Sequence, residues 1–255
     1  MLCTCKRGCI RHLSNATGKI GLSSVLPLLA LAGAFAPQVP ARDNIIVNPS
    51  LSAAMALQRF MANQQPDSRA SVETIEIEAS LPKLNKNGRL RAIRRTPSAN
   101  HPEYQVVEIS GDSMVNHELI ARYLRADERA AQLSNASTAI TQANYTFRFV
   151  GAVQFGDDLE YVFRIIPRKK REGLINGILW IDCDTAIAVR LSGYLVKNPS
   201  IFLKRVNMTR ENRLRDGIVE TRITHLLIDT RLVGSARLVV VERPTTAVGT
   251  APLAP

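Results

Sequence analysis

The chain has 255 residues, of which 45% are hydrophobic and 22% charged, so it can build a sizeable core and is not a disordered chain. Thirty-three Lys and Arg stand against 22 Asp and Glu, which gives a formal charge of +11. Four of these bases and no acid lie in the first 41 residues, so residues 42–255 carry 29 minus 22, or +7. This excess favours anionic partners only moderately.

The N-terminal segment has the pattern of a secretory signal. Basic residues precede an apolar run from Ile20 to Ala36, which Pro27 interrupts. The run is shorter than the roughly 20 apolar residues that a helix needs to cross a bilayer. We expect residues 1–41 to be removed, by cleavage after Ala36 or, because Pro37 hinders that site, after Ala41. The mature protein is then periplasmic, with a domain at 42–243 and a flexible tail at 244–255.

Cysteine usage agrees with export. Cys3, Cys5 and Cys9 all precede the apolar run, so only Cys183 remains after cleavage and no internal disulfide is expected. The N-terminal cysteines have no nearby His or Cys partner set, so neither a metal site nor another cofactor is predicted. Cys183 stands at a predicted turn, where we interpret it as incidental and not as a nucleophile.

The mature chain begins with helical periodicity and changes to strands. A helix is predicted over 49–63, with Asn48 as its N-cap. Its apolar anchors are expected to be Leu51, Met55, Leu57 and Phe60. Residues 71–81 then alternate between apolar and polar, which predicts a half-buried strand, and a second helix is predicted over 113–133, capped by Asp112 or Ser113. Further strands are expected at 90–95, 104–109, 145–155, 161–167, 178–182, 186–195, 202–210, 218–229 and 233–241.

This order of elements predicts an α+β fold. About ten strands joined by short turns cannot form the alternating units of a parallel sheet. We expect a strongly curved antiparallel sheet, an incomplete barrel, with the two helices covering one face. Two helices do not fill the concave side of so broad a sheet, which favours an apolar hollow beneath them.

The later half resembles a known family. A strand ending in Pro167 and basic residues is followed by the spacing Gly173-x-x-x-Gly177 and by a strand that reads hydrophobic-Trp180-hydrophobic-Asp182. Together with the closing segment RITHLLIDTRLVGSARLVVVE, this stretch resembles the outer-membrane lipoprotein-sorting (LolA-like) superfamily. The resemblance implies an incomplete antiparallel barrel, helices as a lid, and a cavity for the acyl chains of lipoproteins or other envelope lipids. It also implies relatives that are envelope sensors or assembly modules, so binding of a protein partner stays open as the alternative.

Candidate binding residues follow from the strand alternation. An apolar cavity would be lined by Tyr145, Phe147, Phe149, Phe163 and Trp180, although the same residues could be ordinary sheet core. The densest basic run is Arg168-Lys169-Lys170-Arg171, which is predicted to meet an anionic membrane surface or a partner, or to be a solvated hairpin end.

No enzyme motif is found. His117-Glu118 opens like a zinc protease motif, but Ala121 stands where the second histidine is required. Export and the lack of a stacking-aromatic motif disfavour nucleic acid as a partner. The prediction is a monomeric, non-enzymatic carrier.

Overall fold

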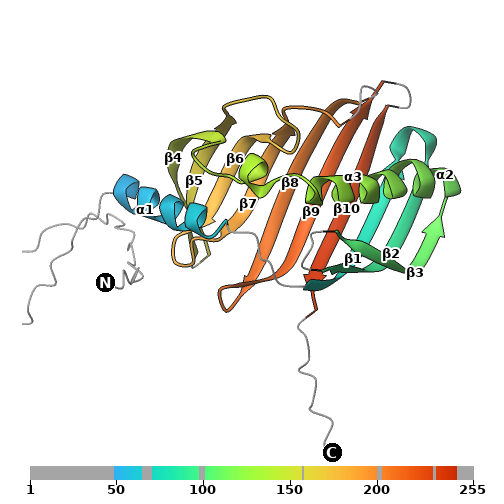
Figure 1. The fold of residues 1–255 in the computed structure, drawn as a ribbon, viewed down its shortest axis with the longest axis horizontal. Helices are drawn as coiled ribbons and strands as arrows, with labels where there is room; N and C mark the ends of the chain where they lie inside the picture. The colour runs from blue at the N-terminus through green and yellow to red at the C-terminus, as the bar shows by residue number, and fades with distance from the viewer. Residues whose placement is uncertain are drawn as a thin grey trace, which may run out of the picture. The chain divides into compact units, whose positions relative to one another are not determined.

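Ten strands form one open antiparallel sheet, and the helices lie on one of its faces (Figure 1). The computed structural model describes residues 49–64, 71–97, 101–156, 158–199, 203–231 and 234–245, which all belong to the compact unit Pro49–Pro255. The predicted signal segment 1–41, the N-cap Asn48 and the tail beyond Thr245 lie outside the described residues.

Each predicted strand is present, and several, β2 and β8 among them, are longer than predicted. The strands are β1 (Ser71–Leu81), β2 (Lys86–Thr96), β3 (Glu103–Gly111), β4 (Tyr145–Phe155), β5 (Asp158–Pro167), β6 (Ile175–Asp182), β7 (Ala188–Leu195), β8 (Leu203–Arg215), β9 (Ile218–Thr230) and β10 (Ser235–Pro244). The helical segments are α1 (Pro49–Ala62), the short turn η1 (Pro82–Leu84), α2 (Ser113–Val115), η2 (Asn116–Ile120), α3 (Ala121–Ala131) and α4 (Asn135–Thr138).

The spatial order of the strands is β3-β2-β1-β10-β9-β8-β7-β6-β5-β4. Two meanders, β1 to β3 and β4 to β10, therefore join where β1 pairs with β10, and Ile77 lies opposite Val240 at that seam. Among the described strands, β3 and β4 are the two edges and do not pair with each other, so the sheet is not closed. The predicted antiparallel sheet is confirmed, and the seam is a long-range pairing that no local pattern indicated.

Helix α1 packs against β4 and β6 through a different stripe from the one predicted. Its buried residues are Ala53, Ala56, Leu57 and Phe60, while Leu51 is 61% exposed and Met55 51% exposed. The prediction of Leu51 and Met55 as anchors was wrong, because these two side chains do not lie on the stripe that faces the sheet, whereas the predicted anchors Leu57 and Phe60 do. The two alanines of that stripe let the helix approach the sheet closely.

The predicted second helix exists as the continuous run α2-η2-α3. Asp112 is its N-cap, since its Oδ1 accepts hydrogen bonds from the N–H groups of Met114 at 2.9 Å and Val115 at 3.3 Å. The segment η2 is a wide π-type turn. Residues five apart lie about 140° apart around an α-helix, but the wider turn brings Val115 and Ile120 to the same buried face.

One predicted turn was too long. Strands were predicted at 202–210 and 218–229, yet β8 continues to Arg215, and β9 begins at Ile218 as predicted. The connection is only Asp216 and Gly217, with φ values of 52° and 74°. Two successive positive φ values are what the tightest hairpins require.

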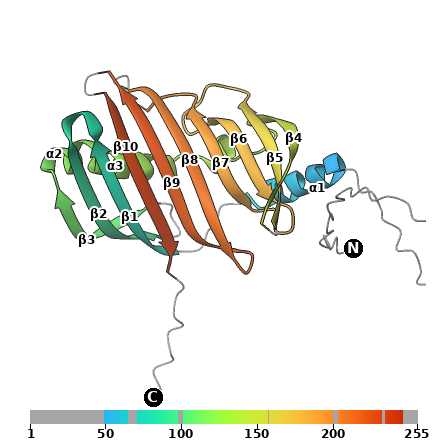
Figure 2. The ribbon, with the colours of Figure 1, turned by 180° about the vertical axis from the view of Figure 1, so that it is seen from behind.

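The helices divide the apolar interior into two clusters. The cluster under α1 consists of Ala53, Ala56, Leu57, Phe60, Tyr145, Tyr161, Phe163, Ile165, Leu174, Ile175, Leu179, Ile181, Ala186, Leu191 and Met208. The cluster under α2-η2-α3 consists of Ile75, Ile77, Ala79, Leu81, Leu90, Ala92, Val115, Ile120, Ala236, Leu238 and Val240. Seen from behind, the opposite face of the sheet carries none of the helices described above (Figure 2). We call the two sides the helix-covered face and the open face.

Candidate functional site

Four of the five aromatic residues predicted to line a cavity lie on the helix-covered face. Tyr145, Phe147 and Phe149 alternate along β4, and Phe163 of β5 lies opposite Phe149 with ring centroids 5.6 Å apart. Tyr145 is 1% exposed and Phe163 3% exposed, whereas Phe147 and Phe149 are only partly buried. The first two are thus core residues of the α1 cluster, and the second two retain accessible surface at its margin.

Tyr145 also has a structural hydrogen bond. Its hydroxyl oxygen accepts from the backbone N–H of Ile175 at 3.1 Å, which ties the beginning of β4 to the beginning of β6. Burial raises the pKa of Tyr145 above its usual value. Tyr145 therefore has a structural role, because it holds β4 and β6 together from within the core.

Trp180 does not join this group. The register of β5 and β6 pairs Phe163 with Leu179 and Val162 with Trp180, so Trp180 points to the open face. There the guanidinium of Arg190 lies 5.3 Å from the centroid of the Trp180 ring. Trp180 was grouped with the other aromatic residues because the sequence alone did not determine which residue of each strand lies opposite which.

The basic run after β5 separates into two anchored and two solvated side chains. Arg168 donates from Nε to the backbone oxygens of Gln142 at 2.9 Å and of Tyr145 at 3.2 Å. Arg171 donates to Oδ1 of Asn144 at 3.5 Å. Lys169 and Lys170 are exposed. Lys169 and Lys170 can therefore contact a membrane or a partner without breaking these hydrogen bonds.

A polar cluster that the sequence did not predict lies on the helix-covered face beneath α3. Arg94 of β2 contacts three carboxylates: Glu73, Glu242 at 2.8 Å and Asp127 of α3 at 3.2 Å. Burial alone would lower the pKa of Arg94, but the charges of Glu242, Glu73 and Asp127 outweigh it and raise the pKa. Tyr104 donates a hydrogen bond to Asp127, and burial together with that carboxylate raises its pKa. This network connects α3 to the seam between β1 and β10.

Two further arginines extend the polar cluster across β8 and β9. Arg222 lies 3.6 Å from Glu242 and donates from Nε to Asn212 at 3.3 Å. Arg210 donates from Nε to Thr224 at 3.3 Å, and within the described residues no carboxylate lies within ion-pair distance of its guanidinium. Desolvation, and then the charge of Arg222, lowers the pKa of Arg210. The Arg210 side chain is half-buried.

A sequence signal for this cluster existed. Arg210 continues the alternation of the buried residues Val206 and Met208, and Glu242 continues that of Leu238 and Val240. A charged residue in phase with buried neighbours points into the interior. That inference requires the strand bounds, and the β8 strand was predicted to end at Arg210.

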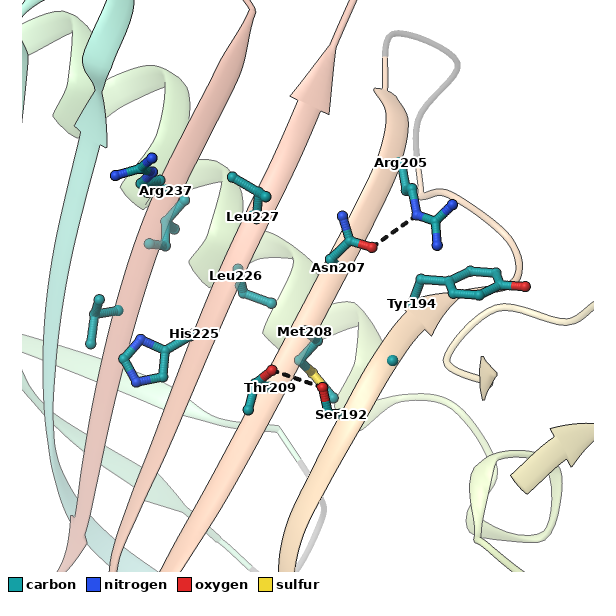
Figure 3. Close-up of a pocket in the computed structure, with 13 residues that line it drawn as sticks. Ser192, Tyr194, Arg205, Asn207, Met208, Thr209, His225, Leu226, Leu227 and Arg237 are labelled. Atoms are coloured by element: carbon teal, nitrogen blue, oxygen red, sulfur yellow. Dashed lines mark hydrogen bonds between the residues drawn. The ribbon is translucent and has the colours of Figure 1, made fainter. Parts of the chain in front are cut away.

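The open face carries a shallow hollow of about 530 Å³ across β7 to β10 (Figure 3). Arg205 lies over Tyr194 with 4.2 Å between its guanidinium carbon and the ring centroid, and donates to Asn207 at 2.8 Å. The hydroxyls of Ser192 and Thr209 are hydrogen-bonded at 3.0 Å. The hollow is lined by Ser192, Gly193, Tyr194, Arg205, Asn207, Met208, Thr209, His225, Leu226, Leu227, Arg237, Leu238 and Val239.

A second hollow of about 330 Å³ adjoins the basic run. Its lining is Pro167, Arg168, Lys169, Lys170, Asn176, Tyr194 and Val196. Tyr194 therefore borders both hollows. Neither hollow is the predicted space between the sheet and its helices.

The described part of the chain contains no cluster of candidate metal ligands, that is, no group of three or more His, Cys, Asp or Glu side chains arranged to hold a metal ion. The thiol of Cys183 lies 3.5 Å from Oδ1 of Asp184, in the turn between β6 and β7. Over the same residues, no helix has the length and apolar character of a membrane span.

Comparisons with known proteins find similarity only among solved structures. No family model matches the chain, and no curated protein matches it. A LolA superfamily protein from Nitrosomonas europaea is 11% identical, with 74% of this chain and 90% of that chain covered and a TM-score of 0.36. A putative outer membrane lipoprotein-sorting protein domain from Vibrio parahaemolyticus is 11% identical over 80% and 96% of the two chains, with a TM-score of 0.36. A DUF1329 family protein from Desulfovibrio piger is 12% identical over 80% and 95%, with a TM-score of 0.34. The structural overlap with each of these neighbours is low.

Proposed function

We propose that this chain is a non-enzymatic periplasmic binding protein that holds an acyl chain of a lipoprotein or another envelope lipid on the helix-covered face. The main support for this proposal is that the helices cover the apolar side chains of that face only in part. Phe147, Phe149, Leu226 and Ile228 point to that face, pack at the edges of the two apolar clusters, and remain only partly buried.

The dimensions of the elements explain why coverage is incomplete. Helices α1 and α3 run across the strands (Figure 1), so together they cover a band about 10–12 Å wide. The strands β8 and β9 have 13 residues each, which corresponds to about 43 Å of length. The two helices therefore cover only part of the length of these strands.

The energetics favour an acyl chain as the ligand. Each buried methylene contributes about 0.8 kcal/mol, so a chain of about 14 methylenes contributes on the order of 11 kcal/mol before ordering costs. Arg210 adds a deep positive charge with one hydroxyl contact, to Thr224, which suits an ester carbonyl or a headgroup anion. The requirement for polar contacts is otherwise small.

The proposal is tested with two adjacent residues of β9. Leu226 points to the helix-covered face and is partly buried, whereas Leu227 points to the open face and is 39% exposed. Leu226→Trp should weaken binding of an uncharged fluorescent acyl ester at least tenfold, and Leu227→Trp should leave it within about twofold. Equal affinities of the wild type and both variants would refute binding at this face. Native mass spectrometry of protein taken directly from cells gives a second readout, since a carrier should emerge holding lipid.

The alternative is a module that binds a protein partner. It is favoured by exposed apolar residues on the edge strand β3, where Val106, Val107 and Ile109 are 52%, 57% and 55% exposed. An edge strand with such residues can pair with an extended peptide. Native mass spectra free of lipid, with a co-purifying peptide or protein that Val107→Lys abolishes, would support this alternative over the carrier.

A further inference from the structure

The open face concentrates positive charge that the protein does not neutralise. Among the described residues, five Lys and Arg side chains and no Asp or Glu line the two hollows, which share Tyr194. Arg205 and Arg237 belong to the first hollow, and Lys169 and Lys170 belong to the second. All four of these side chains are exposed.

Other arginines on the same face are paired, which makes the contrast specific. Arg89 and Arg91 both contact Glu76, at 3.7 Å in each case. Within the part of the chain that the structure describes, no carboxylate lies within ion-pair distance of Arg237, Lys169 or Lys170.

The acidic residue placed closest by the strand register does not neutralise the first hollow. Asp229 of β9 lies opposite Arg205 of β8, but its Oδ1 accepts a hydrogen bond from the hydroxyl of Ser235 at 2.8 Å. Arg205 instead contacts the ring of Tyr194 and the side-chain oxygen of Asn207. Arg205 is therefore held in place by neutral groups.

Apolar side chains accompany the cations. Leu227 lies opposite Arg237 in the register and is 39% exposed, and Ile166 of β5 is 43% exposed on the same face. Tyr194 lies between the two groups of cations. Exposed cations interspersed with accessible apolar and aromatic side chains are typical of surfaces that contact the headgroup region of a bilayer.

We propose that the open face docks on the surface of an anionic phospholipid membrane, with Arg205, Arg237, Lys169 and Lys170 contacting lipid phosphates. Such docking leaves the helix-covered face directed away from the membrane plane. It does not depend on acyl binding at that other face, because the two sets of residues point to opposite sides of one sheet.

The experiment measures co-sedimentation of the full chain with vesicles of phosphatidylglycerol and phosphatidylcholine, compared with phosphatidylcholine alone, in about 0.1 M salt. Each cation near an anionic surface contributes about fivefold to affinity. We expect Arg205→Gln with Arg237→Gln to weaken binding by roughly 25-fold, and Lys169→Gln with Lys170→Gln to do the same. Binding to phosphatidylcholine alone should be weak for every variant.

The matched control is Arg89→Gln with Arg91→Gln, which removes the same charge from the same face but at paired positions. It should change binding by no more than about twofold, because Arg89 and Arg91 lie on β2 and line neither hollow, so they do not contact the lipid phosphates. A loss equal to that of the test variants would overturn the proposal, since net charge alone would then explain binding. Equal binding to both vesicle types, or displacement by millimolar inorganic phosphate or an acidic peptide without vesicle selectivity, would also overturn it. Ile228→Trp, which lies on the helix-covered face and lines neither hollow, should bind vesicles like the wild type, and this separates membrane docking from acyl binding.

Discussion

Replacing Arg94 by Met tests whether the polar cluster beneath α3 stabilises the fold. The Arg94 side chain is 13% exposed and contacts Glu242 at 2.8 Å and Asp127 at 3.2 Å, with Glu73 as the third carboxylate. The Glu242 side chain is 7% exposed. Methionine keeps much of the volume but removes the cation that these carboxylates share, so that, among the described residues, Glu242 keeps only its contact to Arg222 at 3.6 Å. Removing one partner from a buried pair costs about 3–5 kcal/mol in the free energy of unfolding.

Urea unfolding is the appropriate assay, because urea does not screen charge and Trp180 is the one tryptophan in the chain. With a slope of about 2 kcal/mol/M, the midpoint for Arg94→Met should fall by roughly 1.5–2.5 M. The control Arg91→Met alters a neighbouring residue of β2 whose side chain is 44% exposed and lies 3.7 Å from Glu76. An exposed pair of this kind contributes about 0–1 kcal/mol.

The comparison of the two variants decides the matter. If Arg91→Met and Arg94→Met shift the midpoint equally, the ion contacts beneath α3 do not stabilise the fold in the way described. Combining Arg94→Met with Glu242→Gln should recover part of the loss, since it removes one of the uncompensated charges. A double variant that is less stable than Arg94→Met by the full cost of the second change would contradict the coupling.

Two further predictions concern backbone packing and pH. Gly177→Ala should lower the free energy of unfolding by about 1–3 kcal/mol or more, since its added Cβ would lie 2.0 Å from a backbone oxygen of β7. The control is Gly151→Ala, whose Cβ meets nothing within 4 Å. It should be neutral or stabilising by up to about 1 kcal/mol in the same urea titration. Burial raises the pKa values of Tyr104, Tyr123 and Tyr145 above the usual value of 10, so the folded chain keeps phenolic protons that the unfolded chain releases. The free energy of unfolding should therefore fall as pH rises above about 10, and tyrosinate absorbance near 295 nm from these residues should appear only with unfolding, whereas its appearance in the folded protein near pH 10 would contradict their burial.

Local sequence patterns predicted the elements more reliably than their faces. The alternation around Ile75 and Ile77 and the run from Tyr145 to Phe155 correspond to β1 and β4 as observed. Asp112 was named as a cap and is one, because a cap depends on neighbouring backbone N–H groups. By contrast, α1 buries Ala53 and Ala56 in preference to its larger apolar residues Leu51 and Met55, a choice made by the shape of the sheet beneath it.

The candidate site was predictable only in part. Period-two alternation correctly placed Phe147 and Phe149 on one side of β4 and Arg148 on the other. Alternation within one strand does not show which residues of the neighbouring strand point to the same face of the sheet. Trp180 was therefore grouped with side chains that point to the opposite face. The basic run around Lys169 was visible in the sequence, but its proximity to Arg205 across the hollows depends on the pairing of β6, β7 and β8.

The sequence by itself determined what short-range physics controls: the number of strands, the caps and turns, and the excess of basic residues. Tertiary structure alone decided the seam at which β1 pairs with β10, since hydrogen bonds between strands separated by most of the chain leave no local signal. That seam brings Glu73, Arg94 and Glu242 together beneath α3. Strand register also decides on which face of the sheet each remaining charged side chain lies. Register is set by pairing with neighbouring strands, some of which are distant in the sequence.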